Sequence, residues 1–203
     1  AMDSVCSELQ IRNEKVLFWL AIKKKYPVLI KPGRYVFEKP VSYNGLIDIL
    51  RSGRQSPVRI TFSNIRTIND LAGKIAGYIE ADSIQVADFL SDTSNYSRDG
   101  FRRENVISVF IPDTYELYWN TDPEKLYRRM LREYKKFWNS GRLEKCESIS
   151  LSPLEVSVLA SIVDEEALIK EEKQRIAGVY LNRLKGGIPL QSDPTIKFAV
   201  NDF

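Results

Sequence analysis

Apolar side chains recur at helical spacing in several segments of the chain. Residues 14–25 place Val16, Leu17, Leu20 and Ala21 on one side and end before Pro27. This spacing is typical of an amphipathic helix, and the residue before a proline disfavours helical backbone. The same signals predict further helices at residues 44–51, 67–79, 85–91 and 173–184, and one that starts at Asp122-Pro123.

Two short segments alternate between apolar and polar residues, as strands do. Residues 34–37 follow a turn at Lys31-Pro32-Gly33, and residues 58–62 come after Gly53. With the helix at 44–51 between them, they form a strand–helix–strand unit. We therefore predict an α+β protein, with an N-terminal helix and this small subdomain in residues 1–66 and a mostly helical domain in residues 67–203.

One glutamate interrupts the apolar side of a further predicted helix. Residues 151–170 read LSPLEVSVLASIVDEEALIK, with a capping box and a proline at the start. At about 100° per residue, Leu159, Ile162, Val163 and Ile169 all lie within roughly 60° of Glu166. An apolar environment favours the neutral form of a carboxyl group, which suits a general acid. Asp164 points to the opposite side and Glu165 to the edge, so both are expected to be solvated.

Composition narrows the chemistry. The chain has 203 residues, 28% of them charged, a net charge of +3 and no histidine. Basic and acidic residues alternate, which gives no case for nucleic acid. Without histidine there is no Ser-His triad, Cys-His pair or His-ligated metal. Cys6 and Cys146 have no metal-ligand spacing and are either free or joined in a disulfide.

The ends of the chain and its hydropathy bear on location. No apolar run reaches the roughly 18 residues of a membrane span. The start, Ala1-Met2-Asp3, resembles a cloning scar, and Phe203 directly follows a motif-like stretch. We expect a chain that is cut at both ends, from which an anchor and part of a site are absent.

Three polar groups of residues are candidates for chemistry, and each has an ordinary structural explanation. Besides residues 164–166, they are IPDTY at 111–115 and LQSDPT at 190–195. Asp113 either acts in a site or caps a turn through its own backbone. Asp193 precedes a proline, which is a common way to start a turn. None of these signals is specific alone.

Together the motifs are specific. ASIVDEEA at 160–167, IAGVYLNRL at 176–184, LQSDPT at 190–195 and IPDTY at 111–115 resemble the YceG-like endolytic murein transglycosylases, in order and in spacing. The resemblance runs from about Glu14 to the end of the chain. The family's catalytic glutamate is the last acid of its A-S-I-[IV]-E-x-E run, which corresponds to Glu166. Asp164 replaces the family's first acid, Glu165 its usual lysine, and Ala167 its usual threonine.

The resemblance implies a reaction and a set of site residues. Glu166 would be the single acid/base that cleaves the bond between N-acetylmuramic acid and N-acetylglucosamine and leaves 1,6-anhydro ends. The candidates for substrate binding are Asp113, Tyr115, Asn182, Gln191, Asp193 and Thr195. Tyr115 either stacks on a sugar or belongs to the core. Arg183 either meets a peptide carboxylate or forms a surface ion pair. No metal or cofactor is required.

The family also implies partners and a location. Its members carry a LysM-like subdomain, matched here around GRYVF at 34–38, and a single N-terminal helix in the plasma membrane, with the catalytic part facing the periplasm or cell exterior. Peptidoglycan strands are the expected substrate and peptidoglycan synthases expected partners. Two alternatives stay open. One is a non-catalytic peptidoglycan-binding scaffold module, and the other a hydrolase that uses Asp193 or Asp113 as a second carboxylate.

Overall fold

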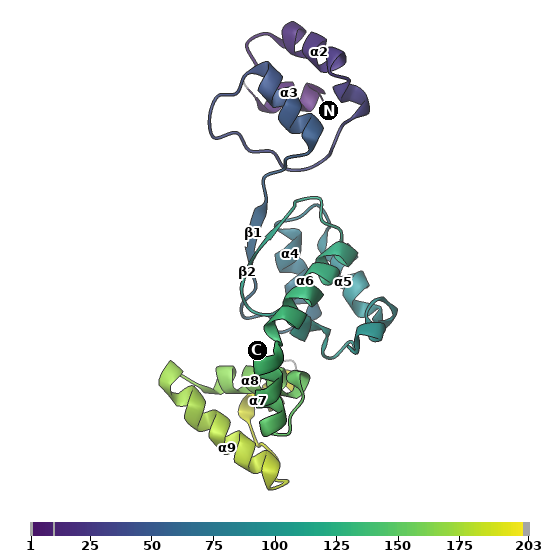
Figure 1. Ribbon diagram of the computed structural model, residues 1–203. Helices are drawn as coiled ribbons and strands as arrows, with labels where there is room; N and C mark the ends of the chain where they lie inside the picture. The colour runs from purple at the N-terminus through teal and green to yellow at the C-terminus, as the bar shows by residue number, and fades with distance from the viewer. Residues whose placement is uncertain (1, 10, 201–203) are drawn as a thin grey trace. The chain divides into compact units, whose positions relative to one another are not determined.

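A computed structural model of the chain describes residues 2–9 and 11–200. It divides into two compact units, the first Ala1–Asn95 with Pro112–Tyr127, the second Tyr96–Ile111 with Arg128–Phe203. The described residues are mainly helical with one small antiparallel sheet (Figure 1), which confirms the α+β class. The boundary expected at residue 66 lies within the first unit, so the division at that point stays a prediction.

The helices and strands follow the predicted order with some additions. The first unit holds α1 (Met2–Glu8), α2 (Glu14–Lys23), α3 (Tyr43–Ser52), β1 (Val58–Thr61), α4 (Ile68–Ala76), α5 (Ser83–Ser91) and β2 (Thr114–Leu117). Helix α6 (Pro123–Phe137) begins in the first unit and continues in the second. The second unit continues with α7 (Ser140–Ser148), α8 (Pro153–Glu166), α9 (Lys173–Lys185) and α10 (Asp193–Val200). Short 3-10 turns lie at Tyr26–Val28, Thr93–Asn95, Ser97–Asp99, Val106–Val109 and Lys170–Glu172.

Side-chain caps explain where the helices begin. The Asn13 side chain accepts a hydrogen bond from the Val16 amide at the start of α2. Thr67 and Asp70 form a reciprocal capping box at α4. Helix α3 ends at Gly53, which has the left-handed conformation that glycine adopts without steric cost. These boundaries are therefore encoded locally.

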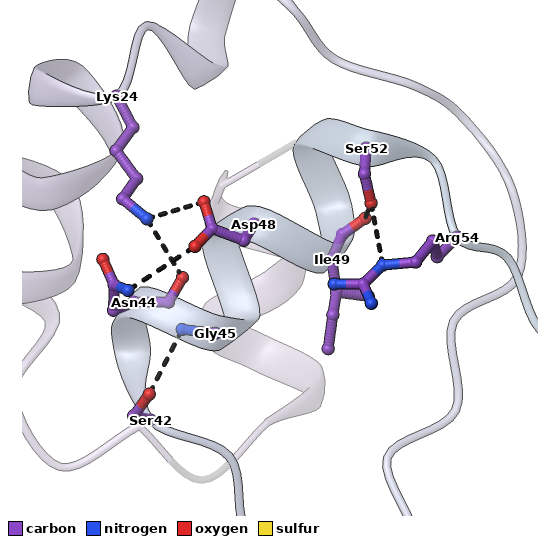
Figure 2. A network of polar contacts seen from close by, with 8 residues as sticks. All are labelled: Lys24, Ser42, Asn44, Gly45, Asp48, Ile49, Ser52 and Arg54. Carbon is purple, nitrogen blue, oxygen red and sulfur yellow. Dashed lines mark hydrogen bonds and ion pairs between the residues drawn. The ribbon is translucent and has the colours of Figure 1, made fainter.

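The N-terminal helices enclose a tight hydrophobic cluster. We call it the N-terminal cluster, and none of its members is more than 4% exposed: Leu17, Ala21, Tyr26, Leu46, Ile47 and Leu50. At its rim, Lys24 Nζ lies 2.6 Å from Asp48 Oδ1 and 3.4 Å from the Asn44 carbonyl, so the lysine ties α2 to α3 (Figure 2). The lysine stem remains partly buried while its charge is paired.

The sheet joins β1 to β2 (Figure 1). Ile60 lies opposite Tyr115 and Thr61 opposite Thr114. Thr114 and Tyr115, the last two residues of the IPDTY motif, belong to this sheet as the start of β2. Residues 34–37, expected as a strand, form no ladder. Tyr35 and Phe37 do pack against the N-terminal cluster, and Val36 is exposed, so the alternation was correct. The Ser56 hydroxyl accepts a hydrogen bond from the Val36 amide. Within the described part of the chain, the Arg34 carbonyl is the one backbone acceptor of residues 34–37 with a backbone partner, the Ser56 amide.

The second unit contains a smaller and more open cluster. We call it the C-terminal cluster; it consists of Leu159, Val163 and Tyr180, which are 5–8% exposed. Helix α8 contributes the first two residues and α9 the tyrosine, and α8 also contacts α10. No single helix in the described part of the chain has the length and apolar character of a membrane span; α7 and α8 reach them only as a pair bent by 77°.

Two predictions about this unit were wrong. Helix α8 ends at Glu166 instead of continuing to residue 170, because its last turn carries three acids and no basic residue beside the negative end of the helix dipole. Asp193-Pro194 opens helix α10 instead of a simple turn, since proline is equally suited to the first positions of a helix.

Candidate active site

Glu166 is the last residue of α8, and its side chain is half-buried. The Tyr180 hydroxyl donates a hydrogen bond to Glu166 Oε1 over 3.0 Å. Tyr180 comes from α9 and is only 5% exposed, so its ring is fixed in the C-terminal cluster while its hydroxyl reaches the carboxyl group. One helix end therefore presents a carboxyl group whose orientation is held from a neighbouring helix.

The three acids of this turn have different surroundings. Asp164 is paired with Lys173 at the start of α9. Glu165 is exposed. Only Glu166 combines partial burial with a hydrogen bond from a buried tyrosine. The helical-face argument selected the same residue, and its catalytic role stays a prediction.

The apolar surroundings predicted for Glu166 are present in part. Leu159 and Val163 are buried on the same helix, and Ile162 packs against their cluster. Ile169 lies beyond the helix end and is exposed, because the chain leaves helical geometry at Ala167. The carboxyl group therefore sits at the border of an apolar cluster and not inside it.

Tyr180 is the residue that the sequence analysis did not single out. A buried tyrosine hydroxyl generally requires a hydrogen-bond partner. A tyrosine among the aliphatic residues of a short core face was therefore a signal that a polar partner lies opposite.

The segment between α9 and α10 is held by Arg183. Its Nη1 donates to the carbonyls of Pro189 and Leu190, over 3.0 and 2.8 Å, and to Gln191 Oε1 over 3.0 Å. Neither role considered for Arg183, a peptide carboxylate ligand or a surface ion pair, matches this arrangement. The guanidinium instead fixes the loop, because its Nη1 lies within hydrogen-bond distance of three oxygens of this segment.

Gln191 adopts the left-handed backbone conformation, with φ of 53°. This conformation is unfavourable for a residue with a Cβ and is retained only where surrounding contacts enforce it. Arg183 supplies such a contact by binding the Gln191 side chain. The candidate ligand Gln191 is thus presented by a loop of defined shape.

The other candidates of this unit are close to the start of α10 or on α9. Asp193 is exposed at the first position of α10. The Thr195 hydroxyl donates to the Ser192 carbonyl over 2.6 Å. Ser192 is fully buried and its hydroxyl has no hydrogen-bond partner within the described structure. Asn182 is exposed on α9, so its side chain is accessible.

Asp113 and Tyr115 belong to the first unit. Asp113 is exposed, and its Oδ1 accepts a hydrogen bond from the Thr114 amide, which is the turn-capping role that the sequence left open. Tyr115 is buried in β2, with its ring centroid 5.7 Å from that of Phe62. Its position is that of a core tyrosine, the alternative to sugar stacking. Their roles in binding remain predictions.

Between residues 2 and 200, apart from residue 10, no three Cys, Asp or Glu side chains gather as ligands for a metal ion. Glu166 itself offers a carboxyl group, and the phenol of Tyr180 is hydrogen-bonded to it.

The fold and the site define an α+β protein whose helical unit holds the half-buried carboxyl group of Glu166 at the end of a helix. The model of the YceG-like family matches residues 2–203, and the chain belongs to this family. A crystal structure of a putative YceG-like protein from Listeria monocytogenes superposes with a TM-score of 0.62 at 18% identity, over 95% of this chain and 68% of that one. The likeness supports the fold.

The relatives with assigned names are longer than this chain, which covers only part of each of them. The endolytic murein transglycosylase of Bacillus subtilis is 26% identical over 98% of this chain and 59% of its own length. The endolytic murein transglycosylase of Streptococcus pneumoniae is 27% identical over 91% of this chain and 38% of its own length. The chain thus spans about three fifths or less of these relatives.

Proposed function

We propose that the chain acts in endolytic cleavage of peptidoglycan strands as a lytic transglycosylase, with Glu166 as the single general acid and base. The observation that carries the proposal is the hydrogen bond from buried Tyr180 to half-buried Glu166. Family membership and the names of the relatives support the substrate class. Because peptidoglycan surrounds the cell, we also propose that the site works outside the plasma membrane.

The proposed reaction needs one carboxyl group. Protonated Glu166 donates its proton to the glycosidic oxygen as the bond between that oxygen and C1 of N-acetylmuramic acid breaks. The 6-hydroxyl of the same sugar bonds to C1, and the Glu166 carboxylate accepts the hydroxyl proton. Proton and bonds balance without water. Intramolecular attack also has a high effective molarity, which replaces the second carboxylate of ordinary glycosidases.

The loop between α9 and α10 would contribute substrate contacts. One polar group comes from Gln191, whose side chain is held by Arg183 of α9. Two more come from Asp193 and Thr195 at the start of α10, a helix that contacts α8. Asn182 adds an exposed amide from α9. These side chains are suited to sugar hydroxyl and acetamido groups, which require donors and acceptors in fixed directions.

Product analysis tests the reaction. The protein as made in the cell is incubated with purified peptidoglycan, and the released glycans are weighed by mass spectrometry. We expect 1,6-anhydro ends, which are one water lighter than hydrolytic products. Reducing ends would establish a hydrolase, and binding without cleavage would establish a scaffold module; both outcomes contradict the proposal.

A matched pair of variants tests the residue. Glu166→Gln should lower the rate at least about a hundredfold, because a positioned general acid contributes roughly 10²–10⁴-fold. Glu165→Gln makes the same chemical change one residue earlier on an exposed side chain and should leave the rate within about threefold, as expected for surface changes. Activity retained in Glu166→Gln, or an equal loss in both variants, would overturn the assignment.

A further inference from the structure

Helix α2 carries apolar side chains on two opposite sides. Leu17 and Ala21 are buried in the N-terminal cluster, which accounts for one side. Val16, Trp19 and Ile22 are 46%, 60% and 68% exposed and lie three residues apart, so they form a second stripe that faces solvent. We call this stripe the outer face of α2. A surface helix normally carries polar residues there.

The outer face is also cationic. Lys15 and Lys23 lie within about 40° of Trp19 around the helix axis, and both are exposed. The Lys23 ammonium is 4.9 Å from the centroid of the Trp19 ring, a cation–π contact. Glu14, the acidic residue of the helix, lies about 140° away from Trp19. Apolar and positive groups therefore share this face without a carboxylate of α2.

The apolar surface continues along the chain after the helix. Val28, Leu29 and Ile30 are 79%, 39% and 46% exposed. Between them and α2 lies Lys25, an exposed residue in the left-handed conformation. Three further apolar side chains and another cation thus follow the outer face in sequence.

We infer that the outer face of α2 docks on an anionic lipid surface. Tryptophan prefers the boundary between headgroups and acyl chains, and lysine stems extend along such a boundary while the ammonium groups meet lipid phosphates. An amphipathic helix with this composition binds in the plane of the interface. The surface is independent of Glu166 and of the reaction proposed above.

A second copy of the chain fits the face less well. Pairing two outer faces brings the lysines of both copies together without an opposing carboxylate on α2. Three exposed residues on one helix are also few beside the roughly 20–30 residues a side of a stable protein interface. A lipid surface needs no such area, because apolar insertion and electrostatic attraction add residue by residue.

Vesicle co-sedimentation tests the inference. The chain is mixed with vesicles of phosphatidylcholine and phosphatidylglycerol, and with vesicles of phosphatidylcholine alone. We expect binding to the anionic vesicles that weakens as salt rises, since the charge term is screened. Trp119 and Trp138 are less exposed than Trp19, so a blue shift of tryptophan emission that disappears in Trp19→Phe locates the contact.

Two pairs of variants separate the face from general hydrophobicity and charge. Trp19→Ser with Ile22→Ser should weaken partitioning at least about tenfold. Ile84→Ser with Tyr118→Ser removes an isoleucine of equal 68% exposure and an exposed aromatic ring elsewhere, and should leave it unchanged. Lys15→Glu with Lys23→Glu should also weaken it at least about tenfold, whereas Lys39→Glu with Lys145→Glu, which changes net charge equally, should not.

Several results would overturn the inference. One is absence of binding to anionic vesicles, and another is equal loss in the test and control pairs. A third is concentration-dependent self-association, measured by sedimentation without lipid, that the Trp19 and Ile22 changes abolish. A fourth is binding to purified peptidoglycan sacculi, without binding to vesicles, that the same changes abolish. Circular dichroism of each variant shows whether the helices are retained.

Discussion

The residues of the N-terminal cluster are more completely buried than those of the C-terminal cluster. No member of the N-terminal cluster is more than 4% exposed, and the charge of Lys24 at its rim is paired with that of Asp48. The C-terminal cluster has three buried members at 5–8% exposure. Two other apolar residues of α9, Val179 and Leu184, are 53% and 42% exposed. The better-packed cluster carries no candidate chemistry, whereas the open one borders Glu166.

The difference has a physical reason. A tightly closed core fixes geometry but excludes substrate, and a carboxyl group placed inside it is costly. At the border of an open core, a carboxyl group keeps access to solvent while one side is fixed by packed residues. Tyr180 combines both properties, because its ring is buried and its hydroxyl reaches Glu166. Rigid support and accessibility therefore come from the same residue.

The largest expected effect compares the same substitution in both clusters. Leu17→Ala should destabilise α2 and its surroundings by about 3–4 kcal/mol, because a fully buried leucine leaves a cavity. Leu159→Ala should cost about 2 kcal/mol, because the open cluster already admits solvent at one side. Amide hydrogen exchange of α2 and α8 measures the opening free energy of each helix.

Hydrogen exchange is the appropriate measurement because a chain of two compact units need not unfold in one transition. Each substitution should act on its own helix. An equal or larger loss for Leu159→Ala would contradict the difference in closure between the clusters.

A smaller effect concerns the polar contact of the open cluster. Tyr180→Phe removes one hydroxyl and keeps the ring, so α8 and α9 should stay folded. In the proposed reaction Tyr180 positions Glu166 and does not bind substrate. The loss of a hydrogen bond worth about 1 kcal/mol should therefore lower kcat roughly fivefold with KM little changed. A purely structural role would also lower the apparent kcat, through the amount of active enzyme, but that loss would not depend on Glu166.

A double-mutant comparison supplies that dependence. In the Glu166→Gln background, Tyr180→Phe should have no further effect on the residual rate, because the carboxylate that it orients is absent. Additive losses in the two variants would mean that Tyr180 acts by another route.

The matching change at the closed cluster should be smaller still. Lys24→Met keeps the apolar stem of the side chain and removes its charge. Because the ion pair with Asp48 is partly exposed, we expect a loss of only about 0.5–1 kcal/mol, which decreases as salt is added. The opening free energy of α2 and α3, measured at low and high salt, tests this; a loss above that of Leu17→Ala would show that the charge pair and not packing secures the cluster.

Much of the fold was predictable because its signals are local. The ends of α2, α3 and α4 follow from Asn13, Gly53 and the Thr67–Asp70 pair, which act within one helical turn. Residues 34–37 show the limit of local signals. The alternation of buried and exposed residues was predicted correctly. Whether a ladder forms, however, depends on a partner strand, and here the Val36 amide donates to the hydroxyl of Ser56 instead of to a strand carbonyl.

Only the part of the candidate site that lies on a single helix could be predicted from the sequence. The helical periodicity of residues 151–170 selected Glu166 over Asp164 and Glu165. The same periodicity also placed Ile169 beside Glu166, but the helix ends at Glu166 and does not include Ile169. Tyr180 and the Arg183 loop contacts join residues on different elements, so no periodicity contains them. Asp193-Pro194 was ambiguous because a turn and a helix start use the same residues.

The smallest expected effect concerns the other end of α8. Glu155 accepts hydrogen bonds from the Ser152 amide and hydroxyl, and these bonds lower the pKa of the Glu155 carboxyl below its usual value. Because the folded pKa is depressed, the contribution to stability is present above the unfolded pKa of about 4.3 and is lost as pH falls through the folded pKa. Glu155→Gln should therefore weaken α8 slightly at neutral pH and make no difference in acid. Carbon-detected NMR titration of Glu155 measures the pKa directly; a midpoint at or above the unfolded value would show that the capping box does not form in solution, and that α8 depends on the open cluster alone.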